Sequence, residues 1–262
     1  MSGRISFPGL RIGGTSWVTP GTLADNLRRL APDLADMEVV LFDTPMASNI
    51  PSPAEVAELA ALCAELDMTC TIHLPAEMDG TVGESDRRRA EDLCLSVMDR
   101  LSLLAPFGWV VHLTGSGIIG RPAEDMKTWT EAVHRSAARL ASALDDPSLL
   151  CVETLGYDFR AAEPVIGSLG LSICLDVGHM VLYDLPAREL IVRYLPRTKI
   201  LHLHGVDPDG TDHRDLRFVD PGLLDFLLER CADGRERVLT VEVFGKEDYE
   251  ASLGVLKNKN GG

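Results

Sequence analysis

Three features are missing from this sequence: an excess of basic residues, closely paired cysteines and a long apolar run. Its 262 residues include 25 Lys and Arg against 40 Asp and Glu, a formal net charge of −15. Nucleic acids and anionic membranes select for basic protein surface, so this balance argues against either as a partner. It remains compatible with a local metal-lined pocket. Apolar residues at 45% and charged residues at 25% are ordinary globular values and exclude a disordered or fibrous chain.

The six cysteines form no CxxC pair, and Cys151 and Cys174 lie inside apolar runs. Such cysteines are typical of small buried side chains in a reducing compartment. No stretch is long and apolar enough to span a bilayer, and residues 1–10 lack the pattern of a signal peptide. We therefore expect a cytoplasmic protein without a membrane span. Its oligomeric state cannot be read from the chain.

No Ser/Gly-rich linker divides the chain, and the first apolar run is followed by Gly13-Gly14-Thr15-Ser16 rather than GxGxxG. Eight short apolar runs alternate with helical stretches, which predicts one (β/α)8 TIM barrel over residues 1–262 rather than a doubly wound sheet. We expect the tail, Lys257–Gly262, to be frayed. The expected strands are Leu10–Gly14, Met37–Phe42, Thr69–His73, Trp109–Leu113, Leu149–Glu153, Leu171–Asp176, Lys199–His204 and Val238–Val243. The expected helices are Thr22–Leu30, Ala54–Leu66, Asp86–Leu104, Ala123–Leu144, Ala187–Leu195 and Pro221–Cys231, with a weaker one at Ala161–Ser168.

Ionisable residues gather where these strands end, which is the catalytic face of such a barrel. Six of the seven histidines lie at or just after a strand end, and only His134 falls in a helix. Residues two apart on a strand share a face, so His202 and His204 both point into the barrel. The strand-end set is Asp43, His73, His112, Glu153, Asp176, His179, His202, His204 and Glu242.

Taken singly, several of these residues have an ordinary structural explanation. His134 is expected to be structural, and Asp43, before Thr44-Pro45, is equally suited to a turn or to substrate binding. The short loop Thr114–Gly117 is not taken as a phosphate site. As a set, however, unpaired ionisable groups in a barrel core would be costly, and divalent metal ions remove that cost. Histidine with carboxylate ligation favours Zn, Mn or Fe over Mg or Ca, without choosing among the three.

The most specific motif is Asp176-Val177-Gly178-His179, in which Gly178 allows a tight turn that returns His179 to the pocket. Together with a Glu ending strand 5, a His-Leu pair on strand 7 and a Glu on strand 8, it resembles the xylose isomerase-like TIM barrels. That superfamily includes sugar isomerases, sugar epimerases and endonuclease IV. The resemblance covers nearly the whole chain and implies four core metal ligands: Glu153, Asp176, His202 and Glu242.

Two branches of that superfamily differ in their metals. The sugar isomerases generally use one ion, and the endonuclease branch adds histidines on strands 3 and 4 and binds three. This sequence has that extra pair in His73 and His112, which implies that Glu153 bridges two ions and that His179 reaches toward a third. After strand 7 it reads Asp212-His213-Arg214 where the endonuclease branch has Asp-x-His, so His213 is open as a ligand, a general acid or a substrate clamp. We expect two or three divalent ions and a phosphodiester hydrolase, with Glu153, His213 and Glu242 as catalytic residues.

The substrate is expected to be a small molecule, because the net charge argues against a DNA duplex. The segments His202–Val206, Asp212-His213 and Leu175–His179 resemble the cobamide-remodelling phosphodiesterases of the superfamily. That resemblance implies cleavage of the nucleotide-loop phosphodiester of a cobamide, giving a corrinoid phosphate and a nucleoside. The alternative is a single-metal sugar (phosphate) isomerase or epimerase with Glu153 and Glu242 as its acid/base pair. Candidate substrate-binding residues are Trp17, Asp43, Tyr157, Tyr183 and His204.

Overall fold

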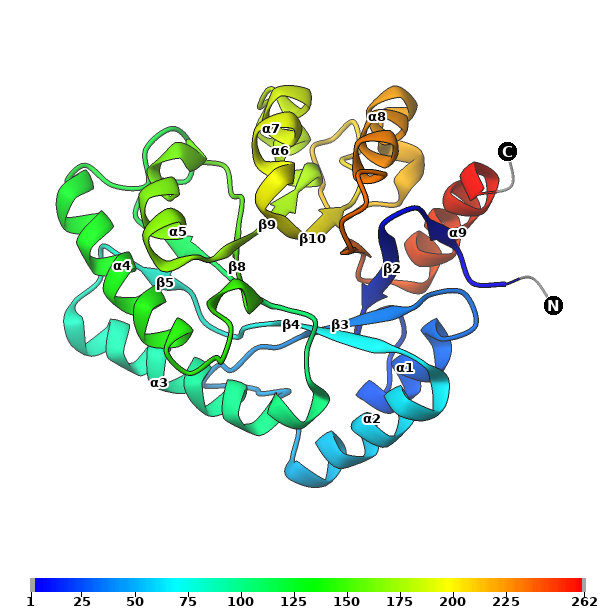
Figure 1. Cartoon of the computed structure of the whole chain (residues 1–262), viewed down its shortest axis with the longest axis horizontal. Coiled ribbons are helices and arrows are strands. Elements are labelled where there is room, and N and C mark those ends of the chain that lie inside the picture. The colour runs from blue at the N-terminus through cyan, green and yellow to red at the C-terminus, as the bar shows by residue number, and fades with distance from the viewer. Residues whose placement is uncertain (1–2, 261–262) are drawn as a thin grey trace.

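The chain forms one closed barrel of parallel strands surrounded by helices. A computed structural model describes residues 3–260. Around the barrel the strand order is β2-β11-β10-β9-β8-β6-β4-β3, and pairing of β2 with β3 closes the ring. Figure 1 shows the helices outside this ring and both termini on one side of the molecule. The predicted single-domain (β/α)8 fold is confirmed.

The barrel strands are short and the helices between them longer. Two further pairings stand outside the eight-strand pattern: β1 runs antiparallel to β2, and β5 runs parallel to β7. The strands are β1 (Ser6–Phe7), β2 (Leu10–Thr15), β3 (Asp36–Val40), β4 (Thr69–His73), β5 (Met78–Asp79), β6 (Trp109–Val111), β7 (Leu113–Thr114), β8 (Leu150–Glu153), β9 (Ser172–Asp176), β10 (Thr198–Leu203) and β11 (Arg237–Val241). The helices are α1 (Leu23–Leu30), α2 (Pro53–Leu66), α3 (Glu84–Leu101), α4 (Met126–Ala141), α5 (Glu163–Leu169), α6 (Val177–Leu182), α7 (Ala187–Tyr194), α8 (Pro221–Cys231) and α9 (Lys246–Asn260).

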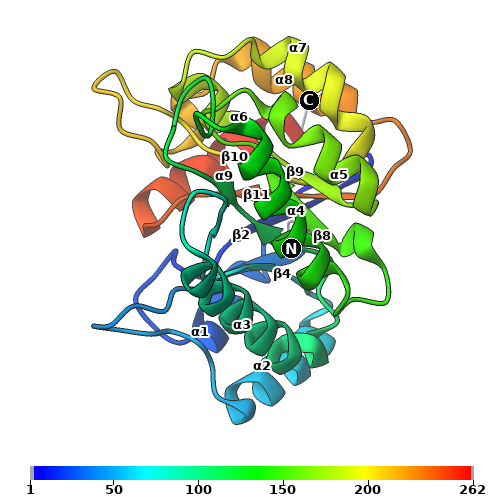
Figure 2. The same ribbon diagram turned by 90° about the vertical axis from the view of Figure 1, so that its left-hand side faces the viewer.

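The first residues of α1 and α2 are set by capping side chains in the local sequence. The Thr22 and Ser52 side chains accept hydrogen bonds from the third residue of α1 and α2, whose own carboxylates bond back to the cap in a capping box. Each such cap is worth about 1 kcal/mol of helix stability. In α2, Pro53 occupies the first turn, where its missing N–H costs nothing. Figure 2, turned by 90°, shows α1 and α2 packed beside each other at one edge of the molecule.

Most predicted elements agree with the structure to within a few residues, with three differences. The strand expected at Trp109–Leu113 is interrupted at His112, because Met78 of β5 bonds to the His112 carbonyl and Leu113 pairs with β5. The prediction of a frayed tail is wrong for residues 257–260, which belong to α9; residues 261–262 lie outside the described range. Helices α6 and α9 were not predicted. Helix α9 is anchored by buried Tyr249, Leu253 and Leu256.

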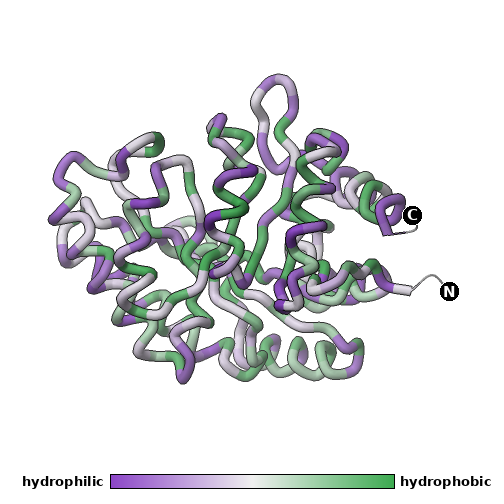
Figure 3. The backbone as a smooth tube through the Cα atoms, turned by 45° about the horizontal axis from the view of Figure 1, so that its top comes forward, coloured by the Kyte–Doolittle hydropathy of each residue, from purple (hydrophilic) through white to green (hydrophobic). Residues whose placement is uncertain are grey.

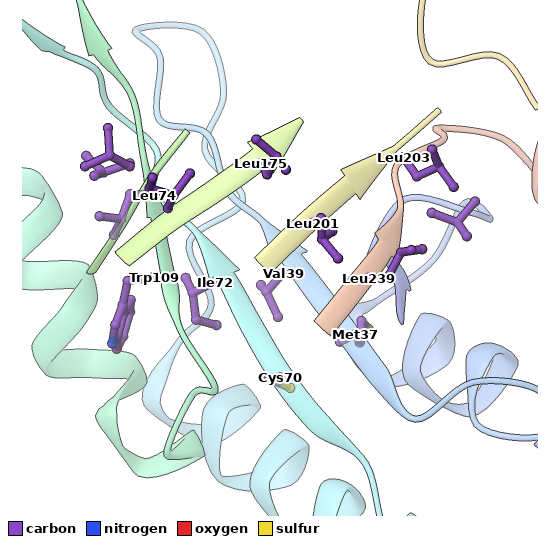
Figure 4. Close-up of a cluster of buried hydrophobic side chains, with 14 of the residues drawn as sticks. Met37, Val39, Cys70, Ile72, Leu74, Trp109, Leu175, Leu201, Leu203 and Leu239 are labelled. Atoms are coloured by element: carbon purple, nitrogen blue, oxygen red, sulfur yellow. The ribbon is translucent and has the colours of Figure 1, made fainter. Parts of the chain in front are cut away.

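Outward-facing strand residues form the main hydrophobic core, between the barrel and its helices. Figure 4 shows such side chains from β3, β4, β6, β9, β10 and β11, among them Met37, Ile72 and Leu201. Figure 3 shows the same division along the backbone, with apolar central strands and more polar outer segments. All six cysteines are free and five are buried, consistent with their predicted role as small apolar side chains. In the part of the chain that is described, no helix is long and apolar enough to cross a membrane.

The barrel interior has an apolar side and a polar side. Val110, Cys151, Cys174 and Ile200 form a small apolar cluster inside the strands. On the opposite side of the interior, strands β3, β4 and β11 contribute the buried residues Asp36, Glu38, Thr71 and Thr240.

Asp36 is one of the incompletely compensated polar groups. One carboxylate oxygen accepts a hydrogen bond from the Thr69 hydroxyl (2.6 Å), and the other, Oδ1, is buried without a partner in the described part of the chain. Burial is the main cause that raises the pKa of Asp36 to about 7, and nearby Glu38 adds to it.

This raised pKa makes folding stability depend on pH. The native state holds a proton on Asp36 that the unfolded state, with a carboxyl pKa of about 3.9, releases. The contribution of Asp36 protonation to the free energy of unfolding is complete below about pH 4. It is lost as the pH rises toward about 7. Asp36→Asn is neutral at every pH, so we expect it to have a larger free energy of urea unfolding than the wild type at pH 8. At pH 5 the difference should be smaller.

The matched control is Asp209→Asn in an exposed loop, which should leave the pH dependence unchanged. A lower stability of Asp36→Asn than of the wild type at pH 8 would contradict this account of the barrel interior.

Candidate metal centre

Glu153, the last residue of β8, lies at the centre of the site. Its side chain is almost fully buried, and its Oε2 atom lies 2.9 Å from His112 Nε2 and 3.4 Å from His73 Nε2. The strands β4 and β6 that place these two histidines lie next to each other in the barrel, and β8 follows β6. His73, His112 and Glu153 therefore form one group of potential metal ligands.

A second group lies on the other side of Glu153. His202 Nδ1 is 3.2 Å from Glu242 Oε2, 3.6 Å from Glu153 Oε2 and 3.9 Å from Asp176 Oδ2. Asp176 ends β9, His202 lies on β10, and Glu242 directly follows β11. The four residues that resemblance alone implied as core ligands are brought together by the barrel.

The chemistry of this second group fits a divalent cation. Asp176 Oδ2, His202 Nδ1 and Glu242 Oε2 are all buried and have no hydrogen-bond partner among residues 3–260. Buried polar atoms of native proteins are nearly always paired, and an orphaned one costs about 1–3 kcal/mol. Three orphaned atoms that converge beside a buried carboxylate are the arrangement that a bound ion would satisfy. Zn, Mn or Fe suit such mixed nitrogen and oxygen ligands.

Glu38 fixes the orientation of His202. Its Oε2 atom accepts hydrogen bonds from His202 Nε2 (2.8 Å) and from the Thr240 hydroxyl (3.0 Å). With its Nε2 proton held by Glu38, His202 would present the lone pair of Nδ1 to an ion bound by the neighbouring carboxylates. A carboxylate behind a histidine ligand fixes its tautomer and raises its basicity.

A third group consists of His179, His204 and His213, whose ring nitrogens lie within 4.8 Å of one another. His204 is buried, with Nε2 unpartnered and 3.5 Å from Asp176 Oδ1, and its Nδ1 atom accepts from the His213 backbone N–H. His213 adopts φ +52°, where the chain turns back over the site. Gly178 lies within helix α6 and not in the predicted tight turn. It makes room for this group, because a Cβ atom there would lie 2.3 Å from the His204 ring. His204 was predicted to bind substrate, and its ring is buried, with almost no exposed surface for such a contact.

The other predicted substrate-binding residues differ in how well they are placed. Trp17 is half exposed in the loop after β2, where its indole N–H donates to the Val40 carbonyl. The Tyr183 ring lies 6.0 Å from the His179 ring. Asp43 is exposed and bridges to Ser48 in its own loop, as its turn interpretation suggested. Tyr157 is almost fully buried and its hydroxyl donates to the Leu113 carbonyl. Its side chain therefore packs against β7 and has almost no contact with solvent.

Sequence reasoning missed Glu38, Glu77 and Thr154. Glu77 Oε1 lies 3.8 Å from His112 Nδ1, and the Thr154 hydroxyl accepts a hydrogen bond from the Asp176 backbone N–H. Glu38 lies in an apolar strand, and its sequence does not show whether its side chain faces the barrel interior or the helices. Glu77 and Thr154 stand in loops and carry no comparable pattern.

The carboxylates also control the charge of the histidines. Burial opposes the charged form of His112, but Glu153 and Glu77 outweigh it and raise its pKa to about 10. Burial likewise opposes ionisation of Glu242, yet His202 lowers the pKa of that carboxyl to about 2. His112 is therefore protonated at neutral pH without metal, and ion binding at His73, His112 and Glu153 must release a proton.

Comparison with known proteins finds one matching family model and many similar solved structures. A family model described as "Xylose isomerase-like TIM barrel" matches residues 37–259. No curated protein matches the chain. Similar solved structures include a D-tagatose 3-epimerase-like protein, with a TM-score of 0.72 and 17% identity over 95% of this chain and 96% of that one. Endonuclease IV from Thermus thermophilus has a TM-score of 0.68 and 21% identity over 95% and 98%. D-Psicose 3-epimerase from Clostridium cellulolyticum has a TM-score of 0.67 and 14% identity over 95% and 96%.

The role assigned to Glu38 predicts a loss of metal affinity without loss of fold. Glu38→Gln removes the negative charge that accepts the hydrogen bond of His202 Nε2. We therefore expect metal affinity to fall by about 10- to 100-fold. Competition with a chromophoric chelator measures this directly. Glu91→Gln, which alters a buried glutamate between α3 and α4, should retain wild-type affinity. Equal affinities of Glu38→Gln and the wild type would show that His202 needs no such support.

Proposed function

We propose that this chain, which belongs to the xylose isomerase-like TIM barrel family, is a metal-dependent phosphodiesterase. The observation that carries the proposal is the placement of His73 and His112 against the same Glu153 oxygen that faces His202. One carboxylate thus stands between two sets of ligands. A single-metal centre would need only the set made by Glu153, Asp176, His202 and Glu242.

Bound to these two sets, divalent ions would activate a water molecule and stabilise the departing oxygen of an in-line displacement at phosphorus. The protein's own contribution is to position the ligands and to move protons. Glu153 holds the two sets together, and Glu38 and Glu77 orient His202 and His112 from behind. Because the ligand atoms are buried, they need no large rearrangement when the ions enter.

His213 is the proposed proton donor to the leaving oxygen. Its Nδ1 atom lies 3.1 Å from the Glu242 carbonyl oxygen, which leaves Nε2 for the substrate side. Its side chain is about one quarter exposed, the largest share in the group with His179 and His204. Water adds to phosphorus and gives up one proton to a catalytic carboxylate, Glu153 or Glu242. The P–O bond to the leaving group breaks, and His213 in its protonated form donates the Nε2 proton to the departing oxygen.

The surface around the site favours a bulky substrate with an apolar body. Ten large apolar side chains are exposed between residues 3 and 260, and eight of them follow the carboxyl ends of barrel strands. Apolar side chains exposed on the loops around a polar centre are typical of a binding site. A small polar ketose would leave this surface in water. The eight residues are Trp17, Met46, Val82, Ile118, Ile119, Val181, Phe218 and Phe244.

A cobamide meets both requirements, and it is the substrate that the resemblance around His202–Val206 and Asp212-His213 implies. Its corrin ring is broad and partly apolar, and its nucleotide loop contains one phosphodiester. Hydrolysis with the nucleoside oxygen leaving gives a corrinoid phosphate and a nucleoside. A DNA duplex fits poorly, because the net charge of −15 repels it.

A sugar epimerase is the second candidate, and two observations favour it. Glu153 and Glu242 both face His202, so a single ion could stand between two carboxylates that exchange protons with a sugar. Two of the three similar structures named above are an epimerase and an epimerase-like protein. This candidate gives His73 and His112 no role in metal binding.

A substrate panel separates the candidates. Metal-loaded protein is given adenosylcobalamin, a duplex containing an abasic site and a set of ketoses, and the products are identified by mass spectrometry. We expect action on the corrinoid alone, yielding a corrinoid that retains its phosphate and a free nucleoside. Glu153→Gln, treated identically, should be inactive although folded, because the carboxylate shared by both ligand sets is lost.

Epimerised ketose with intact corrinoid would establish the second candidate and overturn the first. Cleavage of the duplex would keep the phosphodiesterase chemistry but refute the cobamide as substrate.

A further inference from the structure

Away from the barrel mouth, a basic groove lies between α3 and α4. Figures 1 and 2 both place these two helices side by side. The groove consists of a cavity of about 290 Å³ and a neighbouring one of about 360 Å³. Four arginines line the first cavity: Arg87, Arg88, Arg135 and Arg139. Such a concentration of positive charge is unexpected in a chain of net charge −15.

Two of these arginines are already neutralised by carboxylates. Arg139 bonds to Glu91 (2.9 Å) and Asp92 (2.5 Å), and Arg88 lies 3.7 Å from Glu84 and 3.8 Å from Glu91. These pairs account for both acidic residues that line the first cavity.

The other two, Arg87 and Arg135, have no acidic partner among the described residues. Over residues 3–260, neither guanidinium lies within 4.0 Å of a carboxylate oxygen. Arg87 is 8% exposed, and the one hydrogen bond of its guanidinium within that range goes to the Val82 carbonyl at 3.4 Å. The Arg135 side chain is exposed and makes no hydrogen bond to any described residue. A charge as buried as that of Arg87 is strongly unfavourable unless an opposite charge compensates it.

Both unpaired guanidinium groups line both cavities, so they stand where the cavities meet. In the second cavity, Asp125 uses its oxygens to cap α4 through the N–H groups of Lys127 and Thr128 and the Thr128 hydroxyl. Glu124 is the other acidic residue of that lining, and it is exposed. The carboxylates of the groove are therefore occupied or directed to solvent.

We propose that Arg87 and Arg135 form a binding site for a phosphoryl group, separate from the metal centre. Arginine presents a planar fork of N–H donors that matches phosphate oxygens, and two such forks neutralise a dianion. The space on either side admits the organic part of a phosphate monoester. The source of the group is either free inorganic phosphate or a phosphorylated metabolite such as a nucleoside monophosphate.

The test measures anion binding to metal-loaded protein by isothermal titration calorimetry, with sulfate and a nucleoside monophosphate as separate probes. The variants are Arg135→Gln and Arg87→Gln, with Arg89→Gln as the matched control. Arg89 lies on the same helix, is exposed and pairs with Asp86, so its loss changes the net charge equally outside the groove. We expect binding by the wild type and Arg89→Gln, and a loss of at least tenfold in both groove variants.

Because Arg135 is exposed, Arg135→Gln keeps the test valid even if Arg87→Gln fails to fold. Crystals soaked in selenate should show anomalous density between the two guanidinium groups. Binding of the monophosphate but not of sulfate, with the same dependence on Arg135, supports a metabolite as the source. Equal binding by Arg135→Gln and the wild type, or no binding of either probe, overturns the proposal.

Discussion

The carboxylate of Glu153 is the group on which the rest of this site depends. It lies within 3.6 Å of ring nitrogens of His73, His112, His179 and His202, which come from four other barrel segments. Burial alone would favour its neutral form, but His112 and His202 hold the pKa of Glu153 well below its usual range. One buried negative charge thus organises histidines that would otherwise repel one another once protonated. Metal ions at the same place would replace those protons.

The barrel supports this arrangement through its divided interior. On one side, apolar side chains such as Val110 and Ile200 fill the space with ordinary packing. On the other, Glu38 connects His202 to Thr240, and Asp36 stands deeper with an unsatisfied oxygen. Polar groups in a barrel core reduce stability, and natural proteins retain such costs where function requires them. The polar side of the interior is therefore best explained as support for the strand-end ligands.

Much of this architecture could be predicted from sequence because strand ends are local features. Apolar runs that end in His73, Glu153 or Asp176 reveal both the strand and the ligand, and the barrel fold then brings those ends together. Glu38 escaped notice because a glutamate inside a strand is indistinguishable from a surface residue until barrel closure decides which face is inside. The grouping of His204 with His213 depends on the path of the intervening loop. An antiparallel β-bridge between Gly205 and Arg214 closes this loop. No local pattern encodes that path.

The central claim is that Glu153 joins two ions, and metal counting tests it most directly. Protein purified anaerobically and analysed by inductively coupled plasma mass spectrometry should contain at least two divalent ions per chain. His112→Ala should contain one fewer, because it loses a ligand from only the set formed with His73 and Glu153. One ion per chain in the wild type, unchanged in His112→Ala, would contradict the account and favour a single-metal enzyme.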